Sequence, residues 1–521
     1  MLAIGDEIAH PGQMQGTSDP NRELLDAAAL CGHLVPAGSV HAFLAEHRGE
    51  LFPDEMFTDL FASGRGRPSV PADVIATVMV LQALEGLSDR DAVAELRTNI
   101  AWKVAAGLSL LDEGFHPTVL TLWRNKLRVS ERPERIFDAV RAVVDATGVL
   151  AGRTRRALDS TVLDDAVATQ DTVTQLISAI RRVRRLIPEA ARVALGGHDY
   201  DSAAKPVIAW DDPEAKAGLI TALVSDALAL VSALEGVSLN AEQADAVGLL
   251  ALVAGQDVEP GDTEGTWRIA QRTAPDRVVS TVDPESRHIH KTVHDYRDGY
   301  KAHVAIEPDT GLVTECTLTP GNAPDGPTGV GLVRQEESGL EIYADSAYGS
   351  GETRAALRHA GHDLVIKPVP LIAAVPGGFT RADFVVDHRG RRVTCPAGHS
   401  VDITLSGRAV FGSRCANCPL RQRCNRAVRG KILRFTAHDE ELVYARQAWS
   451  DPLVGEHYRR HRPMVERTLA WLVAGGNRRL RYRGVARNRL WLATRLAALN
   501  LRRLINLGLN RSHSGWVLVP T

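Results

Sequence analysis

The sequence predicts a mixed α/β protein in which a helical N-terminal domain precedes an α/β core that carries two insertions. Three observations lead to this prediction. Helical patterns continue to about residue 150, strand-like and helical runs alternate between about residues 300 and 370, and four cysteines cluster in a Gly- and Arg-rich stretch further on. The chain has 521 residues, a length that suits about three domains at roughly 150 residues each.

Composition and charge indicate what kind of protein this is. Apolar residues make up 44% and charged residues 24% of the chain, as in ordinary soluble globular proteins. Met1–Gln15 lacks a secretory signal and no apolar run approaches the roughly 18 residues of a membrane span, so we expect a cytoplasmic protein. The net charge is only −2, but arginines crowd Arg459–Arg511, where acids other than Glu466 are almost absent. Such a segment can give one face a positive potential that suits nucleic acid.

The first part of the chain reads as a flexible arm (1–20) and a helical domain (21–150). Pro71–Gly86 carries apolar residues on more than one face, as a buried helix does. Short helices joined by tight turns fit a helix-turn-helix-like DNA-binding domain, and a plain helical bundle fits the same pattern. Local signals predict where individual helices begin and end. Gly86 and Gly107 are expected to end helices. Ser88 is expected to begin one through a capping box, and Pro117 to begin another.

The α/β core is predicted over 151–370 and 441–510. A strand within Arg153–Val162 opens it, and a helical insertion of about 171–290, which we interpret as structural, follows. Tyr300–Ile306 and Leu312–Thr319 alternate like the strands of a hairpin. The remaining predicted elements are a helix near Asp325, strands at Leu340–Ala344 and Asp363–Lys367, a helix at Glu352–Ala360, a cysteine-containing insertion at 371–440, basic helices from Pro452 to about Leu509, and a tail at 511–521.

Three acids stand out by their positions in this pattern. Asp159 and Asp345 each follow a predicted strand, and Glu466 lies on a predicted helix one turn after Arg462. The order of acids and elements is that of a ribonuclease-H-like fold. Carboxylates on rigid elements can hold two Mg²⁺ or Mn²⁺ ions about 4 Å apart for phosphoryl transfer. Any one of these acids could be a loop-end charge or a helix cap, but three in one topology favour a metal site.

Longer blocks around these acids carry a resemblance to a known family. They are DST at Asp159, DGYKAHVAIEPDTGLVTECTLTPGNAPD at Asp298–Asp325, ADSAYGSG around Asp345, and YRRHRPMVERTLAWL around Glu466. Over about residues 50–510 the chain resembles bacterial insertion-sequence transposases of the DDE class, in a subgroup with an N-terminal helical domain and a cysteine motif before the catalytic glutamate.

The resemblance implies an activity, a metal requirement and partners. It assigns Asp159, Asp345 and Glu466 as the catalytic triad. Asp164 and Asp165 lie close to Asp159 and are alternative candidates for its role. The enzyme would cleave mobile-element ends at terminal inverted repeats and join them to target DNA, as a homodimer or larger assembly associated with the nucleoid. Two alternatives remain open, a ribonuclease-H-like nuclease without strand transfer and a domesticated, non-catalytic DNA-binding protein.

Relatives in this family carry Tyr, Arg, Glu and Lys at fixed spacing on the last helix. Arg462 and Glu466 match, but Arg459 holds the tyrosine position with Tyr458 beside it, and Val473 holds the lysine position. Arg462 is expected to grip DNA phosphate, and a surface pair with Glu466 one helical turn away is the less favoured explanation. The candidate DNA-binding residues are Arg459, Arg462, Arg467, a possible substitute for the lysine, and Lys301, which with His303 faces either the site or solvent.

The cysteine cluster is the second candidate metal site. Cys415 and Cys418 have the spacing of a zinc knuckle, and Cys395 and Cys424 would complete a structural Zn²⁺ site, with His399 as a less favoured ligand. Four thiolates would leave no open position for catalysis. Reduced thiols without metal are the alternative.

Overall fold

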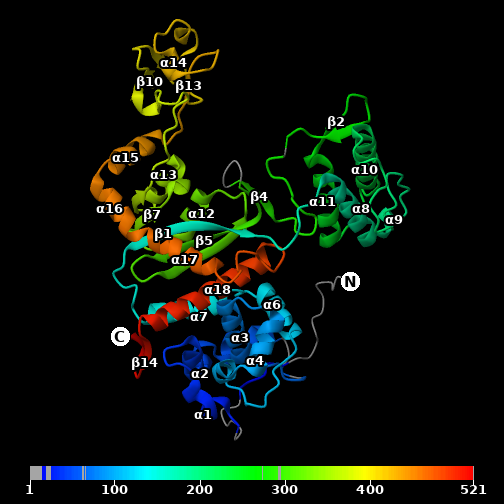
Figure 1. The fold of residues 1–521 in the computed structure, drawn as a ribbon, viewed down its shortest axis with the longest axis vertical. Coiled ribbons are helices and arrows are strands. Elements are labelled where there is room, and N and C mark those ends of the chain that lie inside the picture. Colours follow the sequence, from blue (N-terminus) through cyan, green and yellow to red (C-terminus); the bar gives the residue numbers. More distant parts are fainter. Residues whose placement is uncertain are drawn as a thin grey trace.

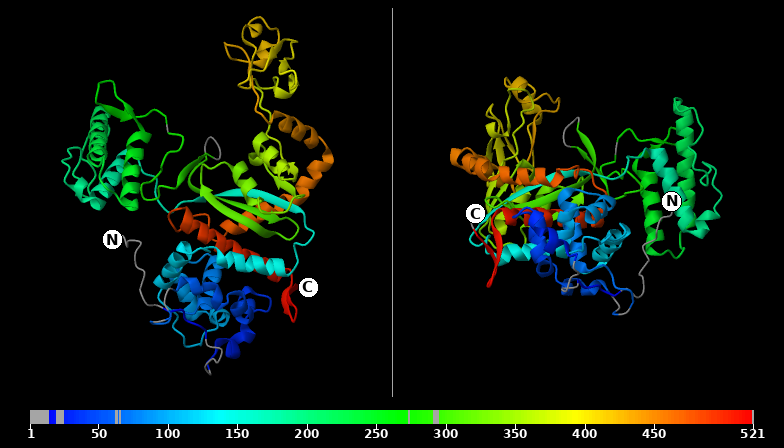
Figure 2. Two further views of the ribbon diagram at one scale, coloured as in Figure 1. Left: turned by 180° about the vertical axis from the view of Figure 1, so that it is seen from behind. Right: turned by 60° about the horizontal axis from the view of Figure 1, so that its bottom comes forward.

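The structure is a computed structural model that describes residues 14–18, 25–61, 64, 66–272, 274–290 and 295–519. Most of the expected arm (1–20) lies outside the described residues. A helical domain occupies one end of the molecule, the sheet with its helices lies in the middle, and a cysteine module stands at the opposite end (Figure 1). A helical insertion projects to one side of the sheet, as the views in Figure 2 also show.

The central sheet has the strand order β4-β5-β1-β7-β8, and β6 also pairs with β5. The first strand, β1 (Arg155–Asp164), lies in the middle, antiparallel to β5 and parallel to β7. This arrangement is the ribonuclease-H-like core that the sequence predicts. The other strands are β4 (Arg287–His290), β5 (Tyr296–Glu307), β6 (Leu312–Pro320), β7 (Glu341–Ala344) and β8 (Asp363–Ile366).

Helices cover the sheet and end where the sequence supplies local signals. Ser350 caps α13 through its hydroxyl, and Pro463 begins α17 directly after α16, because proline suits the first helical turn but not a helix interior. Gly475 and Gly476, both with positive φ, follow the end of α17. The helices are α12 (Asp325–Leu332), α13 (Gly351–His359), α15 (Asp439–Trp449), α16 (Pro452–His461), α17 (Pro463–Val473) and α18 (Val485–Asn506).

Several helices of the N-terminal region begin and end at the residues that the sequence predicts. Gly86 and Gly107 end helices with φ of 74° and 66°, and Ser88 forms a capping box with Asp91. Almost every residue of α3 is buried, as its apolar composition predicts. The helices are α1 (Ala27–Cys31), α2 (Val40–Leu51), α3 (Ala72–Glu85), α4 (Asp89–Thr98), α5 (Ile100–Ala106), α6 (Thr118–Val129) and α7 (Arg135–Ala146).

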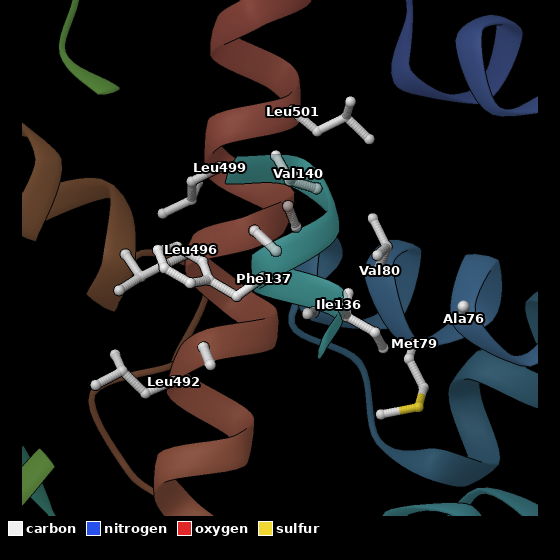
Figure 3. Close-up of a cluster of buried hydrophobic side chains, with 14 of the residues drawn as sticks. Ala76, Met79, Val80, Ile136, Phe137, Val140, Leu492, Leu496, Leu499 and Leu501 are labelled. Atoms are coloured by element: carbon white, nitrogen blue, oxygen red, sulfur yellow. The ribbon is translucent and has the colours of Figure 1, made fainter. Parts of the chain in front are cut away.

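One hydrophobic core joins this domain to the sheet. Leu492, Leu496 and Leu499 of α18 pack beside Phe137 and Val140 of α7 (Figure 3). The same cluster continues into α3 on one side and into β5 and β6 on the other. The long basic helix α18 therefore packs between the helical domain and the sheet, and its apolar face is buried.

The helical insertion has a hydrophobic core of its own, formed by α8, α10 and α11. By length and composition α10 could cross a membrane, with a mean hydropathy of 1.5 over a window that is 39% buried, so the expectation that no apolar run reaches that length is wrong. Its buried side chains contact α8 and α11. The elements are α8 (Thr172–Leu186), α9 (Pro188–Ala191), α10 (Pro213–Ala233), α11 (Ala241–Gln256), β2 (Val258–Pro260) and β3 (Trp267–Ile269).

Two small regions complete the fold. The cysteine module has short strands around a core that includes Phe384, Val393 and Phe411. A C-terminal hairpin occupies most of the stretch that the sequence presents only as a tail. The elements are β9 (Val385–Asp387), β10 (Arg392–Thr394), β11 (Ser400–Asp402), β12 (Arg408–Val410), α14 (Arg421–Cys424), β13 (Ile432–Arg434), β14 (Leu509–Ser512) and β15 (Gly515–Leu518).

Candidate active site

Asp159 lies inside β1 rather than at its end. The strand continues for five residues beyond it, to Asp164, and Asp159 is paired with Val304 of β5. The Asp159 side chain is 13% exposed. Burial raises the pKa of this carboxyl, and the nearby Asp345 raises it further, whereas Arg462 opposes both effects. A carboxylate in this position needs a cation beside it to stay charged.

Arg462 is that cation in the structure. It lies at the break between α16 and α17, and its Nη2 is 2.9 Å from Oδ2 of Asp159. Its Nη1 is 3.7 Å from Oε1 of Glu466. The Arg462 side chain is 4% exposed, and its Nε and Nη1 have no hydrogen-bond partner in the part of the chain that the structure describes. The helical pair with Glu466 therefore exists, but the closer contact of Arg462 is with Asp159 on the sheet.

Asp345 and Glu466 approach the same place from two other elements. Asp345 directly follows β7, which is parallel to β1, and its side chain accepts a hydrogen bond from the Ala347 N–H. Glu466 lies in the first turn of α17 with its side chain 64% exposed. Tyr458 of α16 is half-buried near these groups. Burial raises the pKa of its hydroxyl, Arg462 opposes this, and Asp345 and Glu466 add to it. Asp159, Asp345 and Glu466 are thus gathered around Arg462.

The other charged residues that the sequence offered as candidates do not join this group of acids. Asp164 pairs with Arg297 at 3.0 Å, and the buried Asp165 accepts a hydrogen bond from Ser286. At about 3.3 Å per strand residue, Asp164 is roughly 16 Å along β1 from Asp159. Arg459 and Arg467 are exposed, and neither has an ion pair with an acid among the described residues. Tyr458, not Arg459, faces the acids, and Val473 packs against the core.

Lys301 and His303 do not face solvent, contrary to the commoner expectation for strand residues. Lys301 Nζ is 3.3 Å from Asp325 Oδ2 and donates to the Ala323 carbonyl at 2.9 Å. His303 is fully buried. Sequence patterns did not single out Asp325 as a partner, because it lies on α12, more than twenty residues away.

The four clustered cysteines line one cavity in the cysteine module, together with His399. Burial raises the pKa of the Cys424 thiol, and Cys415, Cys395 and Cys418 add to this while Lys431 opposes it. The Lys431 N–H also donates to the Cys415 sulfur at 3.4 Å. The sequence pattern therefore correctly brings all four sulfurs to one place.

Neither group of candidate ligands is already arranged around an ion. Across the described ranges, no three His, Cys, Asp or Glu side chains stand where they could hold a metal. The donor atoms nevertheless fit in kind, since carboxylate oxygens suit Mg²⁺ and clustered thiols suit Zn²⁺. The raised pKa of Asp159 marks a buried charge that a cation would stabilise. Holding an ion would require these side chains to turn toward a common point.

Two family models match the chain. A transposase DDE domain matches residues 266–501, which include Asp345 and Glu466. A second transposase domain (DUF772) matches residues 33–126, the region from just before α2 to within α6. Together these matches cover more than half of the chain, although β1 with Asp159 lies between them. No curated protein and no solved structure matches it. The chain belongs to the DDE transposases, which are DNA-processing enzymes that use divalent metal ions.

Proposed function

We propose that this transposase cleaves DNA at the terminal inverted repeats of its element and joins the ends to target DNA by metal-dependent phosphoryl transfer. The observation that carries the proposal is the contact of Arg462 with both Asp159 and Glu466, beside Asp345. Three carboxylates from a central strand, a neighbouring strand end and a helix meet around one buried guanidinium. Asp159 and Arg462 are largely buried while Glu466 is exposed, so this group of charges stands at the edge of the core, where it can be reached from outside.

Each group has a role in this proposal. Asp159, Asp345 and Glu466 would hold two Mg²⁺ or Mn²⁺ ions, which when bound supply activation of the attacking oxygen and stabilisation of the leaving oxygen. Arg462 keeps Asp159 ionised and can grip a DNA phosphate near the carboxylates. Glu466 is the exposed member and is free to turn inward from α17.

Exposed arginines extend the DNA contact away from the acids. Arg459 and Arg467 lie on opposite sides of the helix break, and Arg479, Arg481, Arg483 and Arg487 follow on the loop and the start of α18. Contacts of this kind supply affinity and salt dependence rather than sequence recognition. Synapsis of two element ends would require a homodimer or a larger assembly.

A test uses labelled duplex DNA from either side of the gene, with Mg²⁺ or Mn²⁺. We expect nicked element ends and joined products, and we expect Asp345→Ala to abolish both. Asp363→Ala, at the exposed start of β8, is the matched control and should keep activity. Cleavage without joining would favour the nuclease alternative, and metal-independent binding without cleavage would favour the non-catalytic one. Activity that survives Asp345→Ala would refute the assignment of the site.

We also infer that Cys395, Cys415, Cys418 and Cys424 hold a structural Zn²⁺. The support is their shared cavity and the small size of the surrounding core, which has seven buried hydrophobic residues among those described. Small modules with so little core are usually stabilised by a metal or by disulfides. His399 lines the same cavity and is the substitute ligand if one thiol stays outside.

A further inference from the structure

A partly buried cluster of polar side chains lies next to Asp159 along β1. Asp325, the first residue of α12, accepts a hydrogen bond from the Ser160 hydroxyl at 2.8 Å. The Ser160 N–H in turn donates to Oδ1 of Asp159 at 2.8 Å. A fourth carboxylate is therefore connected to the first candidate ligand through a single residue.

Lys301 compensates the charge of Asp325. Its Nζ lies 3.3 Å and 3.4 Å from the two Asp325 oxygens, and both side chains are 16% exposed. His303, the cross-strand neighbour of Ser160, has its Nδ1 3.7 Å from Asp325 and bonds Thr319 through Nε2. Burial lowers the pKa of His303 to about 4, so the ring is neutral at pH 7. Lys301 and Asp325 thus form a pair with no net charge.

The position of α12 is fixed by close packing against the segment that follows Asp345. A Cβ on Gly329 would lie 2.6 Å from the ring of Tyr348, so only glycine allows this approach. Tyr348 is fully buried, which raises the pKa of its hydroxyl, and Asp325, Asp159 and Asp345 raise it further. Through Tyr348, the helix that carries Asp325 is therefore packed near both Asp159 and Asp345.

We propose that Asp325 is a positioning residue of the metal site, holding Ser160 and Asp159 in place while Lys301 cancels its charge. The inference rests on the proposed function. Asp325 itself would touch neither metal nor DNA. A neutral pair behind the site matters because an uncompensated charge at either member would change the attraction of the acids for a cation.

A charge-swap series measures this effect through Mn²⁺ affinity, followed by electron paramagnetic resonance of the free ion. Asp325→Asn keeps an acceptor for Ser160 but leaves Lys301 as an unpaired positive charge, so we expect affinity to fall by at least about fivefold. Adding Lys301→Met to Asp325→Asn removes that charge and should restore most of the affinity. Lys301→Met alone should raise it. A merely structural role would give no such rescue.

Controls separate this inference from the proposed function. Asp309→Asn changes a half-exposed acid at the turn between β5 and β6 and should leave Mn²⁺ affinity unchanged. If the wild type binds no Mn²⁺ that Asp159→Asn abolishes, the proposed function fails. If the wild type binds and Asp325→Asn binds within twofold of it, or the double variant is no better than Asp325→Asn, the positioning role of Asp325 is refuted.

Discussion

Arg462 can have two roles at the site: it pairs with the acids in this structure, and it can contact DNA phosphate when metal ions take its place beside the acids. In this structure its guanidinium neutralises Asp159 and approaches Glu466, the acids that would hold metal ions. We predict that Arg462→Gln raises Mn²⁺ affinity, because the guanidinium no longer competes with the metal ion for Asp159 and Glu466. The same change should lower DNA cleavage by at least about tenfold through loss of phosphate positioning. Mn²⁺ titration and cleavage assays measure the two effects separately.

The control for this prediction is Arg467→Gln on the same helix. Arg467 is exposed, donates a hydrogen bond to the Met464 sulfur and has no ion pair with an acid among the described residues, so its replacement should leave Mn²⁺ affinity unchanged. A fall in Mn²⁺ affinity on Arg462→Gln, with cleavage preserved, would show that the guanidinium supports the ligands instead of competing with the metal.

His303 makes stability depend on pH. Its folded pKa of about 4 lies below the unfolded value of 6.5, so the unfolded chain binds the proton more readily. The neutral ring contributes full stability above pH 6.5, and this contribution is lost as the pH falls toward 4. We predict that His303→Gln loses less stability than the wild type between pH 7 and pH 5, measured by urea unfolding. An equal loss in both proteins would contradict this.

Sequence reasoning found residues whose signals are local and missed those that depend on distant partners. Asp159, Asp345, Glu466 and Arg462 were identifiable from their blocks, and the structure gathers them. Asp325 was not recognisable as the partner of Ser160, because the contact spans 165 residues of chain. Within α16, Tyr458 and not Arg459 lies near the acids, which the family spacing alone did not predict.

Elements were predicted best where caps and glycines mark their ends. The boundaries of α3 and α4 follow from Gly86 and Ser88, and the β5–β6 hairpin follows from alternation. The short strands β2, β3 and β4 were missed, because three or four residues carry too little periodicity to predict pairing. The C-terminal hairpin was missed for the same reason.

The cysteine module yields a prediction at the scale of one element. We expect one zinc ion per chain by elemental analysis, lost in the Cys415→Ser, Cys418→Ser double variant. Because the core of the module is small, zinc loss should open residues 371–440 to protease while the rest of the chain stays folded. Cys31→Ser, outside the module, is the control. Wild-type protein that carries no zinc after purification without chelators would refute the site.

At the scale of the whole molecule, the helical domain and the catalytic core share one hydrophobic cluster. The insertion and the cysteine module have separate cores, so they can unfold locally. The helix α18 packs beside α7 of the helical domain (Figure 3) and also against β6 of the sheet. The two family matches, 33–126 and 266–501, therefore do not correspond to independently packed units. DNA bound by one part would be held rigidly relative to the other.

This shared core predicts that a single substitution in α18 weakens both parts together. Leu496 is fully buried between α7 and the rest of the cluster. Leu496→Ala should lower the free energy of unfolding by about 2–5 kcal/mol, the usual range for a buried leucine. Leu228→Ala, at a half-exposed site on α10, should change it by less than about 0.5 kcal/mol. In Leu496→Ala, hydrogen exchange of the backbone amides should become faster in both α3 and β5, and by the same factor in each. Protection lost in only one of them would mean that the helical domain unfolds independently of the sheet.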